Sequence, residues 1–258
     1  MTNSLREIDP GSTPDAPGKE KETVAATEAM VVELDVLQER LYAQSQQSLL
    51  VVLQAMDTGG KDGTIKHVFR GVNPLGVHVA SFKSPSALEQ SHDYLWRIHD
   101  KVPAKGDITI FNRSHYESVL IERVHSLVPK KQWKARYAQI NAFEDMLVAN
   151  GTTVVKFFLH ISKDEQRRRL LSRLDDPTKR WKFDVNDLHE REYWDAYQEA
   201  YQDVIDKTST ATAPWHVVPA DHKWYRNYVV SRVLIDTLTK MDPQYPARAD
   251  LDGVNRDF

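Results

Sequence analysis

A glycine-rich turn that contains one lysine follows a strongly apolar stretch of the chain. Residues 49–53 read LLVVL and residues 57–64 read DTGGKDGT, so the turn holds Gly59, Gly60, Lys61, Asp62, Gly63 and Thr64. Glycines let backbone N–H groups point at an anion without obstruction by a Cβ, and the N-terminus of a following helix adds partial positive charge. The lysine adds a full charge. These residue types at this spacing favour the binding of a phosphate group.

The match to the common phosphate-loop pattern G-x-x-x-x-G-K-[ST] is incomplete. Ala55 stands where the first glycine is expected, and Asp62 stands where Ser or Thr is expected. A tight turn whose glycines serve only backbone geometry would also account for these residues. Asp57 favours the phosphate interpretation, because a carboxylate directly after a strand can reach a metal ion that bridges phosphates.

Length and composition describe a globular chain. Its 258 residues fit one α/β domain, and 41% hydrophobic with 28% charged residues excludes a disordered chain. No apolar run approaches the roughly 20 residues of a membrane span, and the N-terminus lacks the apolar core of a secretory signal. The absence of cysteine excludes disulfides and thiolate metal sites. We therefore expect a soluble, cytoplasmic protein with no membrane partner.

Positive charge is concentrated in residues 163–182. This segment holds eight basic and four acidic residues, so the rest of the chain carries −7 within a whole-chain charge of −3. A negative chain is not expected to be a general nucleic-acid binder. A solvated helix face and a binding site for a polyanion both explain the segment.

Short apolar runs alternate with amphipathic stretches along the chain. Strands are predicted at residues 49–53, 76–83, 107–112, 154–161 and 215–219, and helices at 23–47, 86–99, 118–128, 130–149, 187–207 and 223–240. Residues 1–22, rich in Pro, Gly, Ser and charge, are predicted to be a disordered tail. Residues 23–242 are expected to form a single domain, followed by a polar C-terminal tail at 243–258.

Alternation of this kind predicts a parallel sheet with helices on both faces, an α/β/α sandwich of three layers. Ligands bind such sheets at the carboxyl ends of the strands. Polar groups at 57–61, at Lys83 and at Asn112 with Arg113 should therefore converge there. Phosphoryl transfer needs cations, a metal ion and positioning. The basic segment follows the fourth strand and is placed like the lid of a nucleotide kinase.

Other chemistries lack their motifs. There is no H-E-x-x-H, no G-x-S-x-G and no dinucleotide fingerprint. His115 is expected to form hydrogen bonds or to pack rather than to act as a base. Trp181, Trp194 and Trp224 are expected to pack in the core or the lid.

Three motifs in order resemble the polyphosphate kinase 2 family. They are DTGGKDGTIK at 57–66, FNRSHYE at 111–117 and DPTKRWKF at 176–183. The resemblance extends over about residues 25–242. Members of that family move a phosphoryl group between inorganic polyphosphate and a nucleotide. Their fold is a thymidylate-kinase-like P-loop sandwich with a helical lid, and this fold agrees with the five strands predicted here. The lid would lie at about residues 163–190.

The resemblance implies roles for individual residues. Asp57, Lys61 and Arg113 would be catalytic, with Asp57 as the carboxylate that works with Mg²⁺, or with Mn²⁺ as an alternative. The remaining loop residues Gly59, Gly60, Asp62, Gly63 and Thr64 would hold phosphate. Lys66, Arg70 and Arg173 would follow the polyphosphate chain, and Lys179, Arg180 and Lys182 would contact it from the lid.

One departure concerns the metal. Many members have Asp-Arg-Ser where this chain has Asn112-Arg113-Ser114, and an asparagine gives a metal ion no charge. More weight therefore falls on Asp57, with Asp62 as a candidate second carboxylate. The run N-R-S-H-Y-E resembles the subgroup that uses both AMP and ADP, since an Asn commonly replaces Glu117 in the diphosphate-only subgroup. We expect Asn112 and Glu117 to lie at the nucleotide, and successive conversion of AMP to ADP and ATP.

Two other functions remain open at this stage. The first is a nucleoside monophosphate kinase that uses ATP as donor, against which the incomplete loop pattern argues. The second is a non-catalytic phosphate or nucleotide sensor, which could dispense with Asp57 and Arg113. The resemblance also predicts a homo-oligomer, either a dimer or a tetramer.

Overall fold

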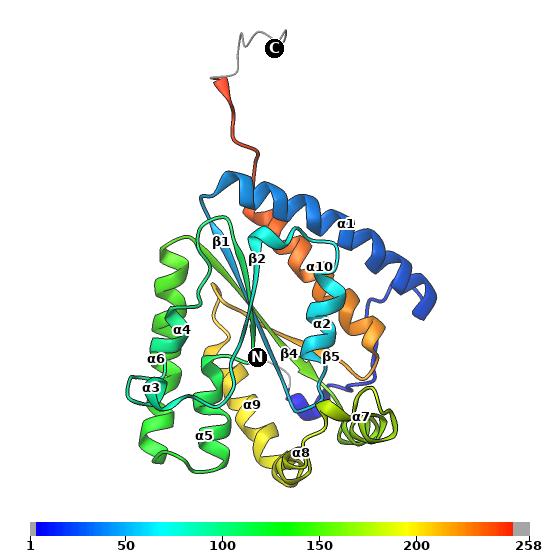
Figure 1. Cartoon of the computed structure of the whole chain (residues 1–258), viewed down its shortest axis with the longest axis vertical. Coiled ribbons are helices and arrows are strands. Elements are labelled where there is room, and N and C mark those ends of the chain that lie inside the picture. Colours follow the sequence, from blue (N-terminus) through cyan, green and yellow to red (C-terminus); the bar gives the residue numbers. More distant parts are fainter. Residues whose placement is uncertain (1–3, 250–258) are drawn as a thin grey trace.

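Within residues 4–249, which the structure describes, five strands form one parallel sheet (Figure 1). The structure is a computed structural model. The strands are β1 (Ser48–Ala55), β2 (Val77–Ser81), β3 (Ile108–Asn112), β4 (Thr152–His160) and β5 (Trp215–Pro219). Their order across the sheet is β2-β3-β1-β4-β5. Central β1 is buried along its whole length, as expected for an apolar strand covered on both faces.

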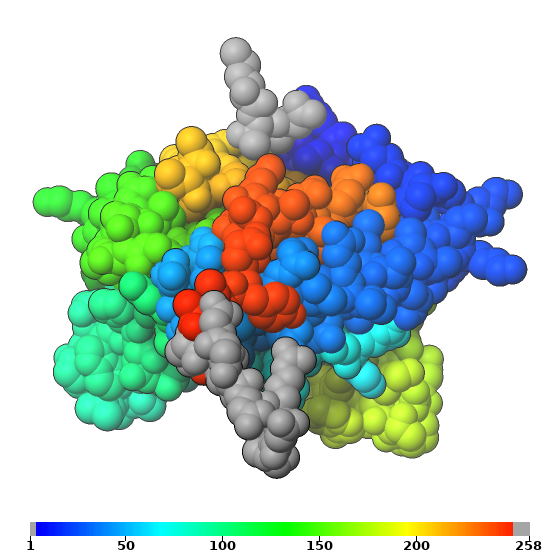
Figure 2. Space-filling view, turned by 90° about the horizontal axis from the view of Figure 1, so that it is seen from above, coloured from blue at the N-terminus to red at the C-terminus, as the bar shows by residue number. Residues whose placement is uncertain are grey.

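Helices cover both faces of this sheet and make the three predicted layers. On one face lie α1 (Glu20–Gln44), α2 (Lys61–Val68) and α10 (Lys223–Met241), and on the other lie α6 (Lys130–Ala149) and α9 (Trp194–Thr208). Figure 2 shows α1 (blue) beside α10 (orange) on one surface of the molecule. The predicted α/β/α sandwich with five parallel strands is therefore confirmed.

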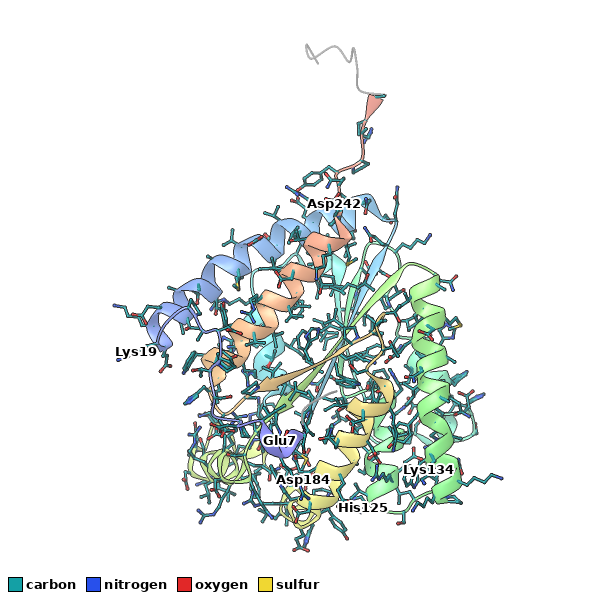
Figure 3. All side chains as sticks on the ribbon, turned by 180° about the vertical axis from the view of Figure 1, so that it is seen from behind. Glu7, Lys19, His125, Lys134, Asp184 and Asp242 are labelled. Carbon is teal, nitrogen blue, oxygen red and sulfur yellow. The ribbon has the colours of Figure 1, made fainter. Side chains whose placement is uncertain are left out.

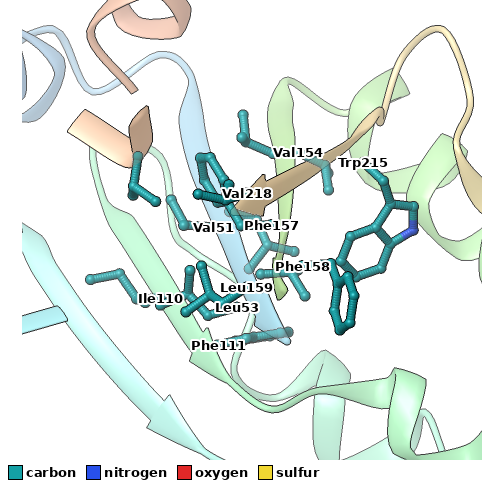
Figure 4. Packing of buried hydrophobic residues seen from close by; sticks show 14 of the residues in the cluster. Val51, Leu53, Ile110, Phe111, Val154, Phe157, Phe158, Leu159, Trp215 and Val218 are labelled. Atoms are coloured by element: carbon teal, nitrogen blue, oxygen red, sulfur yellow. The ribbon is translucent and has the colours of Figure 1, made fainter. Parts of the chain in front are cut away.

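Side chains from neighbouring strands fill the space between the layers (Figure 4). Phe157, Phe158 and Leu159 of β4 are fully buried, and so are Leu53 of the adjacent β1 and Phe111 of β3. Burial of such side chains is the main stabilising contribution to a fold of this kind. It confirms the prediction that residues 154–161 form a buried strand.

Shorter elements complete the fold and correct two predicted helices. They are α3 (Ala87–Gln90), α4 (Trp96–His99), α5 (Ile121–Val124), α7 (Lys163–Asp175) and α8 (Asn186–Glu190), with 3-10 turns at Leu5–Glu7, Pro74–Gly76, His115–Val119, Arg180–Lys182 and Arg191–Tyr193. The single helix predicted at 86–99 is wrong: Ser86 caps α3, but an Asx turn in which Asp93 accepts from the Leu95 amide separates α3 from α4. The helix predicted at 118–128 is likewise replaced by a 3-10 turn and α5.

Residues 4–22 are not the disordered tail that composition predicted for residues 1–22, while residues 1–3 lie outside the described residues. The Leu5 side chain is 2% exposed, and its amide donates to Gln202 Oε1 at 2.7 Å. Pro10 O accepts from the Asp221 amide at 3.1 Å, and Pro14 O accepts from Tyr225 Oη at 2.6 Å. Figure 3 shows the segment running from Glu7 to Lys19, where α1 begins. One buried leucine and a series of satisfied carbonyls hold residues 4–19 against the domain.

The predicted C-terminal tail lies partly outside the described residues. Asp242 ends α10 in the left-handed conformation, and residues 244–249 are exposed, as expected for a polar tail. Tyr245 Oη still donates to Glu39 Oε2 of α1 at 2.7 Å. Nowhere in residues 4–249 does a helix have both the length and the apolar character needed to cross a membrane.

Candidate active site

The loop between β1 and α2 has a conformation that its glycines permit. Gly60 has φ +102°, a value that side-chain-bearing residues rarely adopt. A Cβ on Gly59 would overlap that of Ala55, which explains how an alanine replaces the first glycine of the common pattern. Lys61 opens α2 and its Nζ donates to Ala55 O at 3.1 Å. The predicted strand–loop–helix context is therefore present.

Parallel pairing of β1 with β3 brings the second predicted motif to this loop. Leu53 pairs with Asn112, and the amide of Arg113 donates to Leu53 O at 3.1 Å. Arg113 then turns with φ +61°, and its Nη2 donates to Asp57 Oδ1 at 2.9 Å. These two side chains are 40% and 24% exposed, so they remain open to a ligand. The structure thus brings together the three residues predicted to be catalytic.

Charges around the loop perturb both cations. Burial, with the nearby Arg113 charge as the second cause, lowers the pKa of Lys61 to about 8, while Asp57 and Glu117 partly oppose the change. Burial also lowers the pKa of Arg113, but Glu117 and Asp57 outweigh it and hold that pKa above its usual value. Glu117, predicted to lie at the nucleotide, is therefore close enough to interact with both cations.

The Asn112 amide occupies the position where a second metal-binding carboxylate was expected in related motifs. Its Nδ2 donates to Asp62 Oδ1 at 2.7 Å, so Asp62 is already engaged by a neutral partner. The described residues contain no group of three side chains arranged to hold a metal ion. A metal-binding role for Asp57 stays a prediction.

Three further residues predicted to bind phosphate lie on helix α2 or just after it. Thr64 is fully buried, and its hydroxyl donates back to Gly60 O at 3.1 Å, so it stabilises the helix rather than facing the loop. Lys66 is exposed one turn further along. Arg70 follows the helix and forms an ion pair with Glu28 of α1. The two cations Lys66 and Arg70 therefore lie at increasing distance along the chain from the loop.

The predicted lid corresponds to α7, the turn after it and α8, at the lower edge of Figure 1. Most of its cations already have protein partners. Arg173 Nη1 donates to Lys182 O at 3.0 Å and lies 3.3 Å from Asp187 Oδ2, while Lys179 pairs with Asp176. Arg180 Nε donates to Leu174 O at 2.8 Å. The net charge of this segment therefore overstates the number of unpaired cations that a polyanion would meet there.

Two features show how the lid lies. Trp181 was predicted to pack in the core or the lid. It is 78% exposed and therefore not in the core, and the Lys182 ammonium of the lid lies 4.9 Å from its ring centre. Burial, with the Asp57 charge second, raises the pKa of Asp187 to about 6. Asp187 of α8 is therefore close enough to Asp57 for the two charges to interact.

Sequence analysis missed the buried groups that hold the loop from behind. Gln166 Nε2 of α7 donates to Asp57 O at 3.1 Å. Arg169 Nη1 donates to the carbonyls of Thr58 and Gly59, both at 3.1 Å. Arg226 of α10 lies against Gly60. Arg169 belongs to the basic run and could have been singled out, whereas no local pattern marks Arg226.

A second missed group supports the segment after β3. Glu144 of α6 accepts from Tyr116 Oη at 2.8 Å, pairs with Lys156 of β4, and lies 3.3 Å from His115 Nε2. Gln54 Nε2 donates to Ser114 Oγ at 3.2 Å. The prediction that His115 forms hydrogen bonds is confirmed. This buried network holds the backbone that presents Arg113 and Glu117.

Comparison with known proteins gives concordant results. Residues 18–246 match a family described as polyphosphate kinase 2. The chain is 55% identical over 242 residues to the AMP/ADP-polyphosphate phosphotransferase of Meiothermus ruber, covering 94% of this chain and 91% of that protein. It is 48% identical over 228 residues to the ADP-polyphosphate phosphotransferase of Rhodopseudomonas palustris, covering 84% of this chain and 79% of that protein. Its fold matches the crystal structure of polyphosphate kinase 2 from Arthrobacter aurescens TC1 with a TM-score of 0.94 and 47% identity. The match covers 96% of this chain and 89% of that one.

Proposed function

The chain belongs to the polyphosphate kinase 2 family, and from this we propose that it transfers phosphoryl groups between inorganic polyphosphate and AMP or ADP. One observation carries the proposal: Lys61, Asp57 and Arg113 converge at the carboxyl ends of β1 and β3. The likeness to phosphotransferases covers this whole region. A sensor would need neither Asp57 nor Arg113 at this position.

The site supports an in-line transfer. A phosphate oxygen of the acceptor forms a bond to the terminal phosphorus of polyphosphate, and the bond from that phosphorus to its bridging oxygen breaks. The polyphosphate leaves one unit shorter. Charge spreads over the moving phosphoryl group, so catalysis comes mainly from fixed cations and positioning. Lys61, in a buried position, and Arg113, at the open side, are the cations placed for this task.

The residues fit a magnesium ion that is shared with the substrate. Mg²⁺ is usually bound through one or two carboxylates together with substrate phosphates and water. Asp57 offers one carboxylate, with Arg113 on Oδ1, and the oxygen ligand also suits Mn²⁺. When bound, the ion would neutralise negative charge on the phosphates.

The acceptor choice is proposed from Glu117. The half-buried Glu117 carboxylate interacts with Lys61 and Arg113, which supports a position close to the acceptor phosphate. One similar protein is named for AMP and ADP and another for ADP alone. We expect Glu117→Asn to lose most AMP phosphorylation and to keep ADP phosphorylation. A variant that retains full AMP activity would remove the basis for this assignment.

The donor is tested with ADP as sole nucleotide. Purified protein, Mg²⁺ and long-chain polyphosphate should yield ATP while the polyphosphate shortens, which phosphorus NMR follows directly. Production of ATP and AMP in equal amounts, independent of polyphosphate, would instead identify a conventional nucleotide kinase.

A further inference from the structure

Helix α10 places a guanidinium directly behind the phosphate loop. Arg226 is 1% exposed. A Cβ built on Gly60 would overlap Arg226 Nη1 and lie 3.2 Å from its Cζ, and one on Gly63 would lie 3.4 Å from its Nη2. The Arg226 guanidinium therefore fills the space beside the first turn of α2, where backbone N–H groups lack helical acceptors.

This buried cation lacks a counter-charge. Its Nε and Nη2 donate to Asn227 Oδ1, a neutral amide, at 3.2 and 2.8 Å. Within residues 4–249, no carboxylate oxygen lies within 4.0 Å of it. Burial lowers the pKa of Arg226 to about 9, with Arg169 adding to the effect. A buried charge without a partner destabilises a folded protein.

Arg169, which lies beside Arg226, does have a counter-charge. Its Nε donates to Glu165 Oε1 at 2.6 Å, and its Nη2 donates to Ala220 O at 2.6 Å. Its Nη1 holds the Thr58 and Gly59 carbonyls of the loop. Every side of Arg169 is thus satisfied by protein, and its role in holding the loop is structural. Unlike Arg169, Arg226 needs a counter-charge that the protein alone does not supply.

Other cations strengthen the field at this place. Burial lowers the pKa of Lys223, one turn before Arg226 on α10, and then Arg169, Arg168 and Arg226 lower it further. We call Arg168, Arg169, Lys223 and Arg226 the rear cluster. Glu165 pairs with both Arg168 and Arg169 but carries only one negative charge. The four cations of the rear cluster therefore keep three positive charges beyond this pairing, two of them on Lys223 and Arg226.

We propose that Arg226 is an electrostatic positioning residue for the polyphosphate donor, acting from behind Gly60 on the phosphate held by the loop. The bound anion supplies the counter-charge that Arg226 lacks. This inference rests on the proposed function. In a poorly solvated environment a charge acts across several ångströms with little screening. Arg226 should therefore cost the ligand-free protein stability and increase its affinity for the donor.

The matched pair Arg226→Met and Arg169→Met tests this trade-off. Melting temperature is measured with and without inorganic tripolyphosphate. Arg226→Met should raise the melting temperature of the ligand-free protein by about 2–6 °C, because the unpaired charge is removed. Arg169→Met should lower it by about 6 °C or more, because Glu165 and the loop carbonyls lose their partner. The rise caused by tripolyphosphate should fall by at least half in Arg226→Met.

Kinetics provide the second measurement. Arg226→Met should raise the KM for polyphosphate about tenfold or more, with a smaller change in the KM for ADP. This ratio should vary little between low and high salt, since the charge is buried. Arg226→Lys should restore part of the affinity. Arg232→Met, two turns further along α10, is the control and should leave the KM unchanged.

A structural role for Arg226 would give different results. If Arg226→Met lowers the ligand-free melting temperature as Arg169→Met does, or leaves the tripolyphosphate shift unchanged, the proposal is wrong. Wild-type protein that transfers from polyphosphate but is not stabilised by tripolyphosphate would overturn it while the proposed function stands. Wild-type protein stabilised through Arg226 but unable to transfer from polyphosphate would support the site and overturn the function.

Discussion

The loop region and the lid both gather positive charge, but they hold it differently. Lys61, Arg169 and Arg226 are buried around the loop, fixed by β1, α7 and α10. The lid cations Lys179, Arg180 and Lys182 are exposed and rest on carboxylates, carbonyls or an aromatic ring of the lid itself. Buried charges are strong and insensitive to salt, whereas exposed pairs contribute little and are screened.

This difference suggests a division of labour. The loop supplies fixed charge where the phosphoryl group moves, which is the part of the site that must be preorganised. We propose that the lid exchanges its internal pairs for contacts to a polyanion, which would suit capture and release. Mutations in the two regions should therefore differ in size and in salt dependence.

Lys61→Ala should have the largest effect. Removal of one fixed cation at the transferring group is expected to lower kcat/KM for polyphosphate about 10²- to 10³-fold. The fold should persist, because within residues 4–249 the Lys61 ammonium makes one hydrogen bond, to Ala55 O. Steady-state kinetics with ADP as acceptor give the value. Activity within tenfold of the wild type would contradict the assigned role.

The pH dependence of the wild type should report Lys61. Its folded pKa of about 8 lies below the ordinary 10.5, so the loop loses its cation as pH rises through 8. The value of kcat/KM for polyphosphate should fall about tenfold from pH 8 to pH 9 or slightly above, since this parameter follows the free enzyme. Lys61→Arg should remove the decline, because arginine stays charged. A flat wild-type profile up to pH 9.5 would mean that Lys61 keeps its charge there.

The same shift has a consequence for stability, with a definite sign. Between pH 8 and 10.5 the unfolded chain binds a proton at Lys61 that the folded chain does not. The contribution of this group to folding stability therefore increases with pH over that window, and its cost is fully present below pH 8. Chemical denaturation of the wild type and Lys61→Met at pH 7.5 and 9.5 isolates it: the difference between the two proteins should shrink at the higher pH.

Arg173→Ala should have the smallest effect of the series. Arg173 is partly exposed and paired with Asp187, so its loss is expected to raise the KM for polyphosphate only about threefold at low salt. The ratio to wild type should approach one at high salt, because the contact is screened. A large loss that salt does not change would place Arg173 with the buried loop cations instead.

Sequence predicted what depends on local pattern. The strands follow from apolar runs, and the loop follows from its glycines and Lys61, since both signals lie within a few residues. Parallel strands then placed Arg113 beside Asp57 by topology alone. The break between α3 and α4 was missed because an Asx turn at Asp93 competes with helix formation over a stretch of otherwise helical spacing.

Contacts between distant segments could not be predicted. Leu5 is held in the core and bonded to Gln202 of α9, and Arg226 meets Gly60 because α10 packs beside α2. The pairing of the lid cations likewise depends on the tertiary fold rather than on their number. The oligomeric state and the roles of the individual phosphate-binding residues stay predictions.

The most direct test of the account uses AMP, Mg²⁺ and long-chain polyphosphate with no ATP, and resolves the nucleotides over time. We predict that ADP forms first and ATP follows. The Lys61→Ala variant, purified and assayed in the same way, should be nearly inactive. Formation of ADP from AMP only after ATP is supplied as donor would contradict the account.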